Sequence, residues 1–220
     1  MVDFKRLEAV IWDMDGVLLD SRPSHFKAWD AIFEKYQMEA KPKELRKTFG
    51  MTNQEVIQYI ADQPISPDFS ERIGSEKDLI FQHFIRDLAV FLPGVKDWLE
   101  RFRESGINQA LASSGSPGNI RVILKVLEAE SYFERIVSGD GKPSKPDPFI
   151  FLTTADQLEK PPTSCLVIED STAGVQAAKA AGMRCAAVTT TNPAHKLAAA
   201  DVVYDNLSEM TVDTIQELFS

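Results

Sequence analysis

Residues 9–21 read AVIWDMDGVLLDS, and this stretch decides how the rest of the chain is interpreted. Its first four residues form a short apolar run, rich in β-branched side chains, that predicts a buried strand. Two aspartates separated by one residue follow the run directly. Because side chains two residues apart in an extended chain point the same way, Asp13 and Asp15 are predicted to face one cavity. Gly16 lets the backbone turn sharply beside them.

Two carboxylates held this close together need something to offset their repulsion, which is roughly 4 kcal/mol at about 4 Å and an effective dielectric near 20. A divalent ion such as Mg2+, a shared proton or a nearby lysine would each serve, and the first two are usual in phosphoryl-transfer and acid–base sites. The alternative interpretation is a solvated turn after a strand, because aspartate and glycine are favoured in turns. The rest of the sequence decides between the two.

Composition and charge narrow the class of protein. The chain of 220 residues is 44% hydrophobic and 26% charged, which is typical of a soluble globular protein. Its 24 Lys and Arg against 33 Asp and Glu give a net charge of -9. Such a charge disfavours binding to nucleic acid or to an anionic membrane, so we expect neither as a partner. An anionic substrate then needs local positive charge from lysine, metal and backbone N–H groups.

Cysteine usage and the lack of long apolar segments predict a cytoplasmic protein. Cys165 and Cys185 lie in apolar runs and are interpreted as reduced core thiols in a reducing compartment. No uninterrupted apolar segment approaches the roughly 20 residues of a membrane helix, and the N-terminal residues MVDFKRLEAV lack the apolar region of a signal peptide. We expect a monomer, with a dimer as the alternative.

Hydrophobic periodicity divides the chain into two kinds of segment. Residues 22 to about 88 carry helical patterns and no convincing strand. Beyond residue 92, helical patterns alternate with strand-like runs: INQALAS, RIVSG, SCLVIE, RCAAVT and VVY. This alternation predicts a parallel sheet covered on both faces. The predicted fold is an α/β core of residues 1–20 and 90–220, split by an all-helical insertion of residues 21–89.

Polar side chains follow the predicted strands where each one ends. The carboxyl ends of parallel strands lie at one edge of the sheet, where ligands bind, so these side chains are expected to gather there. Ser113 offers a hydroxyl, and the SSGS turn offers backbone N–H groups at a helix start, which is a natural anion site. Glu169 and Asp170 add oxygen ligands for Mg2+ opposite Asp13. The whole set is Asp13, Asp15, Ser113, Ser114, Lys145, Glu169 and Asp170.

Several of these polar groups also have an ordinary structural explanation. Ser116 and Asp170 precede predicted helices and are typical N-terminal caps. Lys145, which would neutralise a phosphate and the attacking carboxylate, is one lysine among many, and Lys142 is its rival. These explanations do not account for the whole pattern, in which an aspartate pair, a serine pair, a lysine and a second acidic pair follow consecutive predicted strands.

Four segments resemble, in order and spacing, the four motifs of the haloacid dehalogenase superfamily. They are DMDGVLLDS, LASSGS, SKPDPFIF and VIEDSTAGVQAAKAAGM. The helical insertion after the first motif resembles the helical cap subclass of that superfamily. The resemblance implies a Rossmann-like core and a mobile cap that closes over a site holding Mg2+.

The resemblance also implies a role for each matching residue. Asp13 is implied to be the nucleophile that becomes an aspartyl-phosphate, and Asp15 the general acid–base that protonates the leaving oxygen and then activates water. Family members that displace halide lack the second aspartate, so its presence indicates phosphate chemistry. The residues implied to bind phosphoryl oxygens are Ser113 and Lys145, and those implied to hold Mg2+ are Asp13, Glu169, Asp170 and the backbone carbonyl of Asp15.

The similarity extends to the β-phosphoglucomutase-like branch. The stretch DSRPSHFKAWDAIFEKY resembles that branch's first cap helix, and His25 is implied to link cap closure to the acid–base aspartate; the alternative is an ordinary helix residue. A mutase of that branch holds a second phosphate in its cap and has an arginine in the loop that here reads GMTNQE. Asn53 stands there instead and lacks the bidentate cationic fork of arginine, although Lys77 would supply a replacement charge.

The sequence therefore predicts a Mg2+-dependent phosphatase of a small phosphorylated metabolite, with a sugar phosphate as first choice. Substrate selection is expected in the loop from Gly50 to Asn53 and around Lys77, and the predicted binding residues are Gly16, Ser114, His25, Asn53 and Lys77. A phosphomutase of the β-phosphoglucomutase type is the second hypothesis. A phospho-accepting signalling domain is a remote third, because such domains lack a large helical insertion and carry the accepting aspartate on a later strand.

Overall fold

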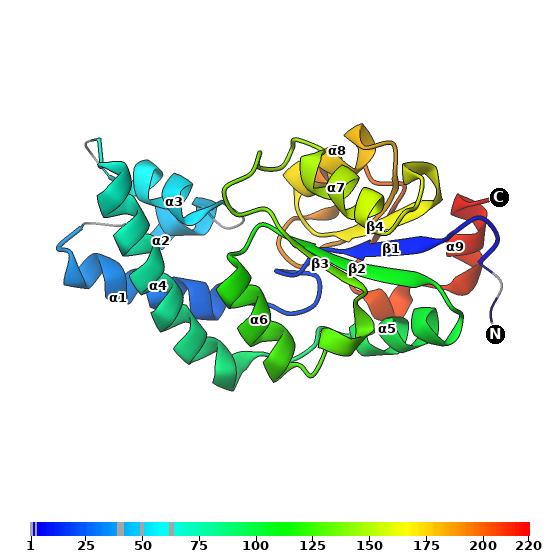
Figure 1. Cartoon of the computed structure of the whole chain (residues 1–220), viewed down its shortest axis with the longest axis horizontal. Helices are drawn as coiled ribbons and strands as arrows, with labels where there is room; N and C mark the ends of the chain where they lie inside the picture. Colours follow the sequence, from blue (N-terminus) through cyan, green and yellow to red (C-terminus); the bar gives the residue numbers. More distant parts are fainter. Residues whose placement is uncertain (1, 3, 39–41, 49–50, 62–63) are drawn as a thin grey trace.

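A six-stranded parallel sheet lies at the centre of the computed structural model, which describes residues 2, 4–38, 42–48, 51–61 and 64–220 (Figure 1). The strands are β1 (Ala9–Trp12), β2 (Asn108–Ser113), β3 (Arg135–Ser138), β4 (Cys165–Glu169), β5 (Arg184–Val188) and β6 (Val202–Tyr204). Their order is β3-β2-β1-β4-β5-β6, so β1 lies between β2 and β4. Trp12 pairs with Leu111 of β2 and with Ile168 of β4. The residues that follow these three strands therefore emerge at one edge of the sheet.

Five helices cover the two faces of this sheet. They are α5 (Val95–Glu104), α6 (Pro117–Val126), α7 (Phe149–Gln157), α8 (Thr172–Ala180) and α9 (Val212–Leu218). Val10 and Trp12 of β1 pack with apolar side chains of α5, α6 and α9, whereas Ala9 and Ile11 pack with those of α7 and α8. β1 is thus buried on both faces, which explains its uninterrupted apolar sequence.

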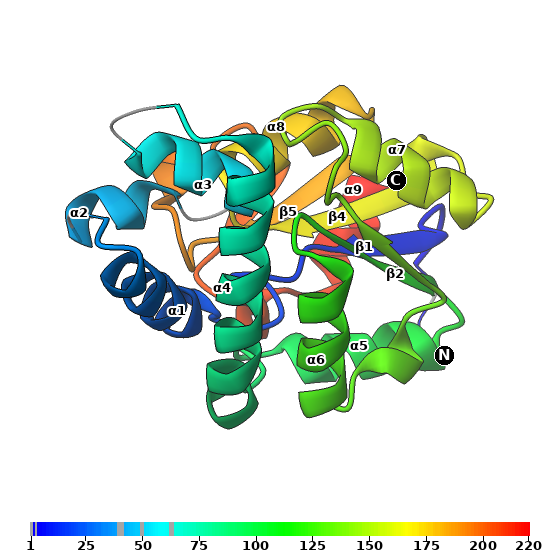
Figure 2. The same ribbon diagram turned by 60° about the vertical axis from the view of Figure 1, so that its left-hand side comes forward.

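Four further helices lie together beside the sheet, as Figures 1 and 2 show. They are α1 (Arg22–Lys35), α2 (Pro42–Leu45), α3 (Asn53–Ile60) and α4 (Pro67–Leu88). They share a hydrophobic cluster of their own, to which Trp29, Ile57 and Ile73 contribute. Farther along α4, Phe81 and Ile85 pack into the cluster on the first face of the sheet. The longest helix therefore joins the helical insertion to the core.

The predicted fold class is confirmed, because a parallel α/β core carries an all-helical insertion directly after its first strand. Within the region of predicted helical patterns, α2 is short and passes into a 3-10 turn at Arg46–Thr48; Gly50 lies outside the described residues. Helix α9 was not predicted. It has only seven residues, too few for a clear helical period, and the Thr211 side chain caps its start.

Two smaller expectations concern the cysteines and membrane spans. Cys165 and Cys185 are buried free thiols, as expected. Among the helices in the described part of the chain, none is long and apolar enough to cross a membrane.

Asp201 anchors the segment that leads into β6, and its replacement gives a pH-dependent prediction. Its Oδ2 accepts hydrogen bonds from Lys179 Nζ at 2.6 Å and from the Cys185 N–H at 2.7 Å. Burial alone would raise the pKa of Asp201, but these bonds and the nearby cations hold it below its ordinary value. A depressed folded-state pKa contributes stability above the unfolded value of about 3.9, and this contribution is lost as the pH falls through the folded value.

We therefore expect Asp201→Asn to lower the free energy of unfolding by about 1–2 kcal/mol at pH 7, allowing for solvent screening of the partly exposed lysine. The difference from wild type should shrink towards pH 3. Urea denaturation at both pH values measures it, and a deficit independent of pH would contradict this account.

Candidate active site

The backbone turns sharply just after β1, and Gly16 makes the turn possible. Asp13 still belongs to the sheet, since its N–H donates to the Ile168 carbonyl at 3.0 Å. Gly16 has a φ of +86°, in the left-handed region that favours glycine, and its N–H donates to the Leu19 carbonyl at 2.8 Å. A Cβ at this position would overlap the Asp170 carboxylate. Gly16 therefore allows the turn after β1 to lie directly against the end of β4.

Gly16→Ala should be clearly more destabilising than an alanine placed at another left-handed glycine. The added methyl group would combine backbone strain with a clash against Asp170, and we expect the free energy of unfolding to fall by about 2–4 kcal/mol. Gly106→Ala is the matched control, because Gly106 has a φ of +71° and open space where the Cβ would be. Its expected cost is about 1 kcal/mol. Equal losses in urea denaturation would show that the contact with Asp170 is unimportant.

Lys145 connects the carboxylates at the ends of two strands. Its Nζ donates to Asp13 Oδ1 and to Glu169 Oε1, each at 2.6 Å, and its side chain is 9% exposed. Burial would lower the pKa of Lys145, but the two carboxylates raise it above its ordinary range, so the ammonium is retained. Its rival in the sequence, Lys142, is exposed on the rim of a cleft. The geometry therefore places Lys145 at the strand ends.

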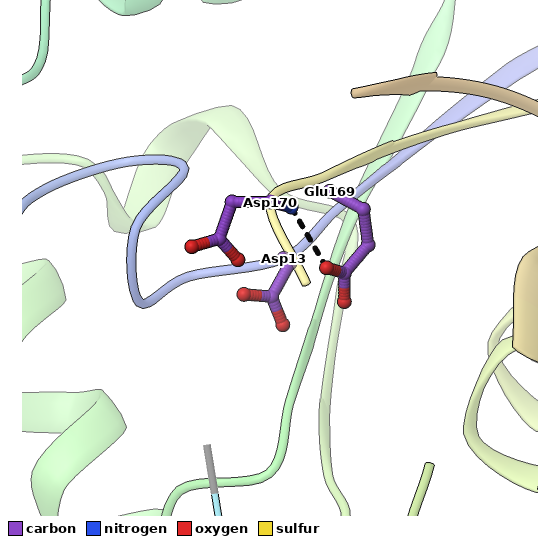
Figure 3. Close-up of side chains that lie close together, drawn as sticks. All are labelled: Asp13, Glu169 and Asp170. Atoms are coloured by element: carbon purple, nitrogen blue, oxygen red, sulfur yellow. Dashed lines mark hydrogen bonds between the residues drawn. The ribbon is translucent and has the colours of Figure 1, made fainter. Parts of the chain in front are cut away.

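Three acidic residues lie close together, as Figure 3 shows, and Lys145 contacts two of them. Asp13 follows β1, whereas Glu169 and Asp170 lie at the end of β4, and one oxygen of each lies within 4.8 Å of the others. Glu169 Oε2 accepts from the Asp170 N–H at 2.8 Å, from the Ser171 N–H at 2.8 Å and from the Ser171 hydroxyl at 2.9 Å. With Oε1 bound to the lysine, Glu169 is held at both oxygens.

Asp170 is held by the loop that follows β5. The Thr191 hydroxyl donates to Asp170 Oδ2 and lies 3.1 Å from the Asp170 carbonyl oxygen, which also accepts from Asn192 Nδ2 at 3.2 Å. The carboxylate is therefore fixed in position between the turn at Gly16 and this loop.

The acidic cluster carries more negative charge than one ammonium compensates. Burial raises the pKa of Asp13 to about 8 against the opposing effect of Lys145, and the charges of Glu169 and Asp15 add to the rise. Burial and the charges of Glu169 and Asp13 likewise raise the pKa of Asp170 well above its ordinary value. A divalent cation would favour the ionised forms of these carboxylates, and carboxylate oxygens are the ligands that Mg2+ prefers. The donor set therefore fits a hard divalent cation.

Asp15 contacts the helical insertion. The Ser21 hydroxyl donates to Asp15 Oδ1, and Nε2 of His25, on α1, lies 3.7 Å from the same oxygen. On the other side of the imidazole, Nδ1 lies 2.9 Å from Lys77 Nζ, and the ring stacks on Phe81 with the centroids 4.1 Å apart. Since an ammonium only donates hydrogen bonds, Nδ1 accepts, and the proton of the neutral ring is then on Nε2, facing Asp15.

The charge states of this chain of groups follow from burial and neighbouring charge. Burial lowers the pKa of His25, and the positive charge of Lys77 lowers it further, which favours the neutral ring. Burial would raise the pKa of Asp15, but interactions with His25, the Ser21 hydroxyl and Lys77 together hold it below its ordinary value. Asp15 is therefore a carboxylate at neutral pH in the substrate-free protein.

The serine-rich turn after β2 comprises residues 113–116. Ser113 is 1% exposed, and its Oγ accepts a hydrogen bond from the Gly115 N–H at 3.0 Å. Ser116 occupies the N-cap position of α6, as expected, but its hydroxyl does not cap the helix. It donates instead to Asp78 Oδ2 at 2.7 Å.

A cleft of about 760 Å³ lies between the helical insertion and the loops after β2 and β3. Four of the five residues expected to bind substrate line it, namely Ser114, His25, Asn53 and Lys77, and Asp15 lines it too. The fifth, Gly16, contacts Asp170 instead. Lys77 is only 2% exposed and already has polar partners in His25 and Asp78, so its charge is less available than the sequence suggested.

Sequence reasoning missed several residues that shape this site. Thr191 follows the strand-like run RCAAVT, so the rule that identified the other strand ends applies to it as well. Ser21 ends the first motif, directly before a predicted helix, and nothing in the sequence indicated that its hydroxyl would pair with Asp15. No sequence pattern singled out Asp78, because its role depends on how α4 packs against α6.

Comparisons with known proteins show the family to which the chain belongs. The family model described as haloacid dehalogenase-like hydrolase matches residues 10–188. A phosphorylated carbohydrates phosphatase of Thermotoga maritima is 35% identical over 182 residues, which are 80% of this chain and 82% of that protein. The beta-phosphoglucomutase of Bacillus subtilis is 31% identical over 219 residues, which are 96% of this chain and 95% of that protein. The crystal structure of a beta-phosphoglucomutase from Clostridium difficile has a TM-score of 0.87 at 28% identity and covers 97% of both chains.

The chain belongs to the haloacid dehalogenase-like hydrolases. Its similarity to phosphatases and phosphoglucomutases of that family confirms the β-phosphoglucomutase-like branch expected from the sequence motifs. Within the family, the relatives named as phosphatases place it among the phosphoric monoester hydrolases.

Proposed function

We propose that the chain is a Mg2+-dependent phosphatase of a small phosphorylated metabolite, with sugar phosphates as the best-supported class. One observation carries this proposal. At the end of the parallel sheet, Asp13 accepts a hydrogen bond from Lys145 and lies close to Asp170, beside a cleft that Asp15 lines. The relative named for phosphorylated carbohydrates supports the substrate class. Residues 21–89 are proposed to act as a cap over a core of residues 1–20 and 90–220.

The acidic cluster is the proposed metal site. Asp13, Glu169, Asp170 and the backbone carbonyl of Asp15 would hold Mg2+, whose positive charge would stabilise the phosphoryl oxygens. Lys145, which donates a hydrogen bond to Asp13, would supply a second positive charge. Ser113 and Lys145 are proposed to bind the phosphoryl oxygens together with the backbone N–H groups of the serine-rich turn.

In the first half-reaction, a carboxylate oxygen of Asp13 attacks phosphorus, and the bond from phosphorus to the leaving oxygen breaks. Asp15, in its protonated form, donates its proton to that oxygen. Asp15 is ionised in the substrate-free protein, but the negative charge of an arriving phosphate favours its protonation. The Nε2–H of His25 faces the same carboxylate and would help to hold its orientation.

In the second half-reaction, water attacks the phosphorus of the aspartyl-phosphate and releases the Asp13 carboxylate. Asp15, now ionised, takes a proton from the attacking water. The same residue thus serves as acid and then as base, and inorganic phosphate leaves the site.

The test is phosphate release with and without Mg2+ across sugar phosphates, phosphoglycolate, pyrophosphate and nucleotides. Isomerisation of glucose 1-phosphate is followed in parallel, because the similarity to beta-phosphoglucomutases makes a phosphomutase the second candidate. Metal-dependent release that is highest for one sugar phosphate is the expected result. Isomerisation without net phosphate release would favour the mutase.

A further inference from the structure

Asp78 places a carboxylate in the wall of the cleft. It lies on α4, and its side chain is 13% exposed. Asn53 Nδ2 donates to its Oδ1 at 3.0 Å, and the Ser116 hydroxyl donates to its Oδ2 at 2.7 Å. Lys77 Nζ lies 3.3 Å from Oδ1. Both oxygens of the carboxylate therefore have partners from other side chains.

These partners form a donor set suited to an anion. Asn53 is the first residue of α3 and Ser116 is the N-cap residue of α6, so an amide, a hydroxyl and an ammonium meet near two helix starts. Such groups bind phosphate or carboxylate groups of ligands. In this chain Asp78 already occupies them, so an anionic group of a ligand would have to compete with a built-in carboxylate.

The charged residues that line the cleft also disfavour an additional anionic group of a ligand. Among the described residues that line it, the carboxylates are Asp15, Glu55, Glu71, Asp78 and Asp140, and the lysines are Lys77 and Lys142. The ammonium of Lys77 is paired with Asp78, which leaves Lys142 on the exposed rim. Burial alone would raise the pKa of Asp78, but Lys77 and the hydrogen bonds hold it below its ordinary value, so it is charged at neutral pH.

We propose that Asp78 makes the cleft selective for phosphate monoesters with a neutral, hydroxyl-bearing leaving group, and against substrates that carry a second phosphate or a carboxylate. Hydroxyl groups can donate to the carboxylate, whereas a second anion meets a like charge and finds its donors already occupied. This inference rests on the proposed phosphatase function and deepens it by naming the chemical class of the leaving group.

The experiment compares matched substrates that differ by one anionic group. Fructose 6-phosphate is paired with fructose 1,6-bisphosphate, and glycerol 3-phosphate with 3-phosphoglycerate. The wild-type enzyme should prefer the member of each pair that has a single anionic group by at least about tenfold in kcat/KM, the effect of one partly screened like-charge contact. Asp78→Asn should reduce this preference by about tenfold, chiefly by lowering KM for the member with two anionic groups.

Gln82→Ala is the matched control. Gln82 Nε2 donates to Asn119 Oδ1 at 3.1 Å, so it also joins α4 to α6, but it carries no charge. This variant should keep the wild-type preference. An unchanged preference in Asp78→Asn, or the same loss in Gln82→Ala, would overturn the inference.

The wild-type measurement alone is also decisive, even where Asp78→Asn fails to fold. An active wild-type enzyme that hydrolyses both members of each pair equally well would overturn the role of Asp78 and leave the proposed phosphatase intact. Absence of metal-dependent release from every compound would overturn the proposed function, and this inference with it.

Discussion

Asp13→Asn is expected to abolish phosphate release while leaving the fold intact. The amide of asparagine cannot form the acyl-phosphate, so turnover should fall by at least about 10⁴-fold. The substitution keeps the shape of the side chain and removes one of the crowded carboxylates at the ends of β1 and β4. Lys145 retains its second partner, Glu169, at 2.6 Å. The far-ultraviolet circular dichroism spectrum should therefore match that of the wild type.

The matched control for this variant is Asp156→Asn, which makes the same chemical change on the exposed surface of α7. It should retain wild-type turnover. Residual activity of Asp13→Asn within tenfold of the wild type would show that Asp13 is not the nucleophile.

Lys145→Met should have the second largest effect, on both activity and stability. Loss of the ammonium leaves Asp13 and Glu169 buried without their shared partner, and breaking a buried ion pair costs about 3–5 kcal/mol. The raised pKa of Asp13, about 8, lets this group take up a proton, so we expect the lower end of that range. Phosphate release should fall by about 10³-fold or more, because positive charge aimed at the transition state is lost.

Mg2+ distinguishes this explanation from a simple packing defect. Without the ammonium, a divalent ion is the remaining compensation for the acidic cluster, so Mg2+ should raise the melting temperature of Lys145→Met more than that of the wild type. Lys142→Met is the control for stability and should change the free energy of unfolding by less than about 0.5 kcal/mol. Destabilisation by Lys142→Met, with none by Lys145→Met, would mean that the wrong lysine has been placed in the site.

The convergence of the acidic groups was predictable from the sequence because it depends on backbone topology alone. Short apolar runs such as AVIW and CLVIE, in a chain where they alternate with helical patterns, predict buried strands between helical layers, and parallel strands bring their carboxyl ends to one edge. Asp13 and Asp170 follow such runs directly, and Glu169 is the last residue of one. Lys145 is separated from its strand by a loop, so the strand ends alone do not distinguish it from Lys142. The resemblance of SKPDPFIF to a family motif indicates Lys145, and the structure places its Nζ against Asp13 and Glu169.

Contacts between helices were not predictable in this way. The hydrogen bond from Ser116 to Asp78 joins α6 to α4, and it depends on how these two helices pack. In the sequence, Ser116 looked like a helix cap and Lys77 like a free charge. The structure gives both residues partners within the wall of the cleft, because a largely buried carboxylate must be hydrogen-bonded.

The most direct test of the central claim identifies the residue that becomes phosphorylated. The enzyme is mixed with its best substrate and Mg2+, quenched in acid and treated with borohydride, which reduces an aspartyl-phosphate to homoserine. Peptide mass spectrometry then locates the modified residue. We predict homoserine at position 13, dependent on substrate and absent from Asp13→Asn. Modification of a different residue, or of none during active turnover, would contradict the account.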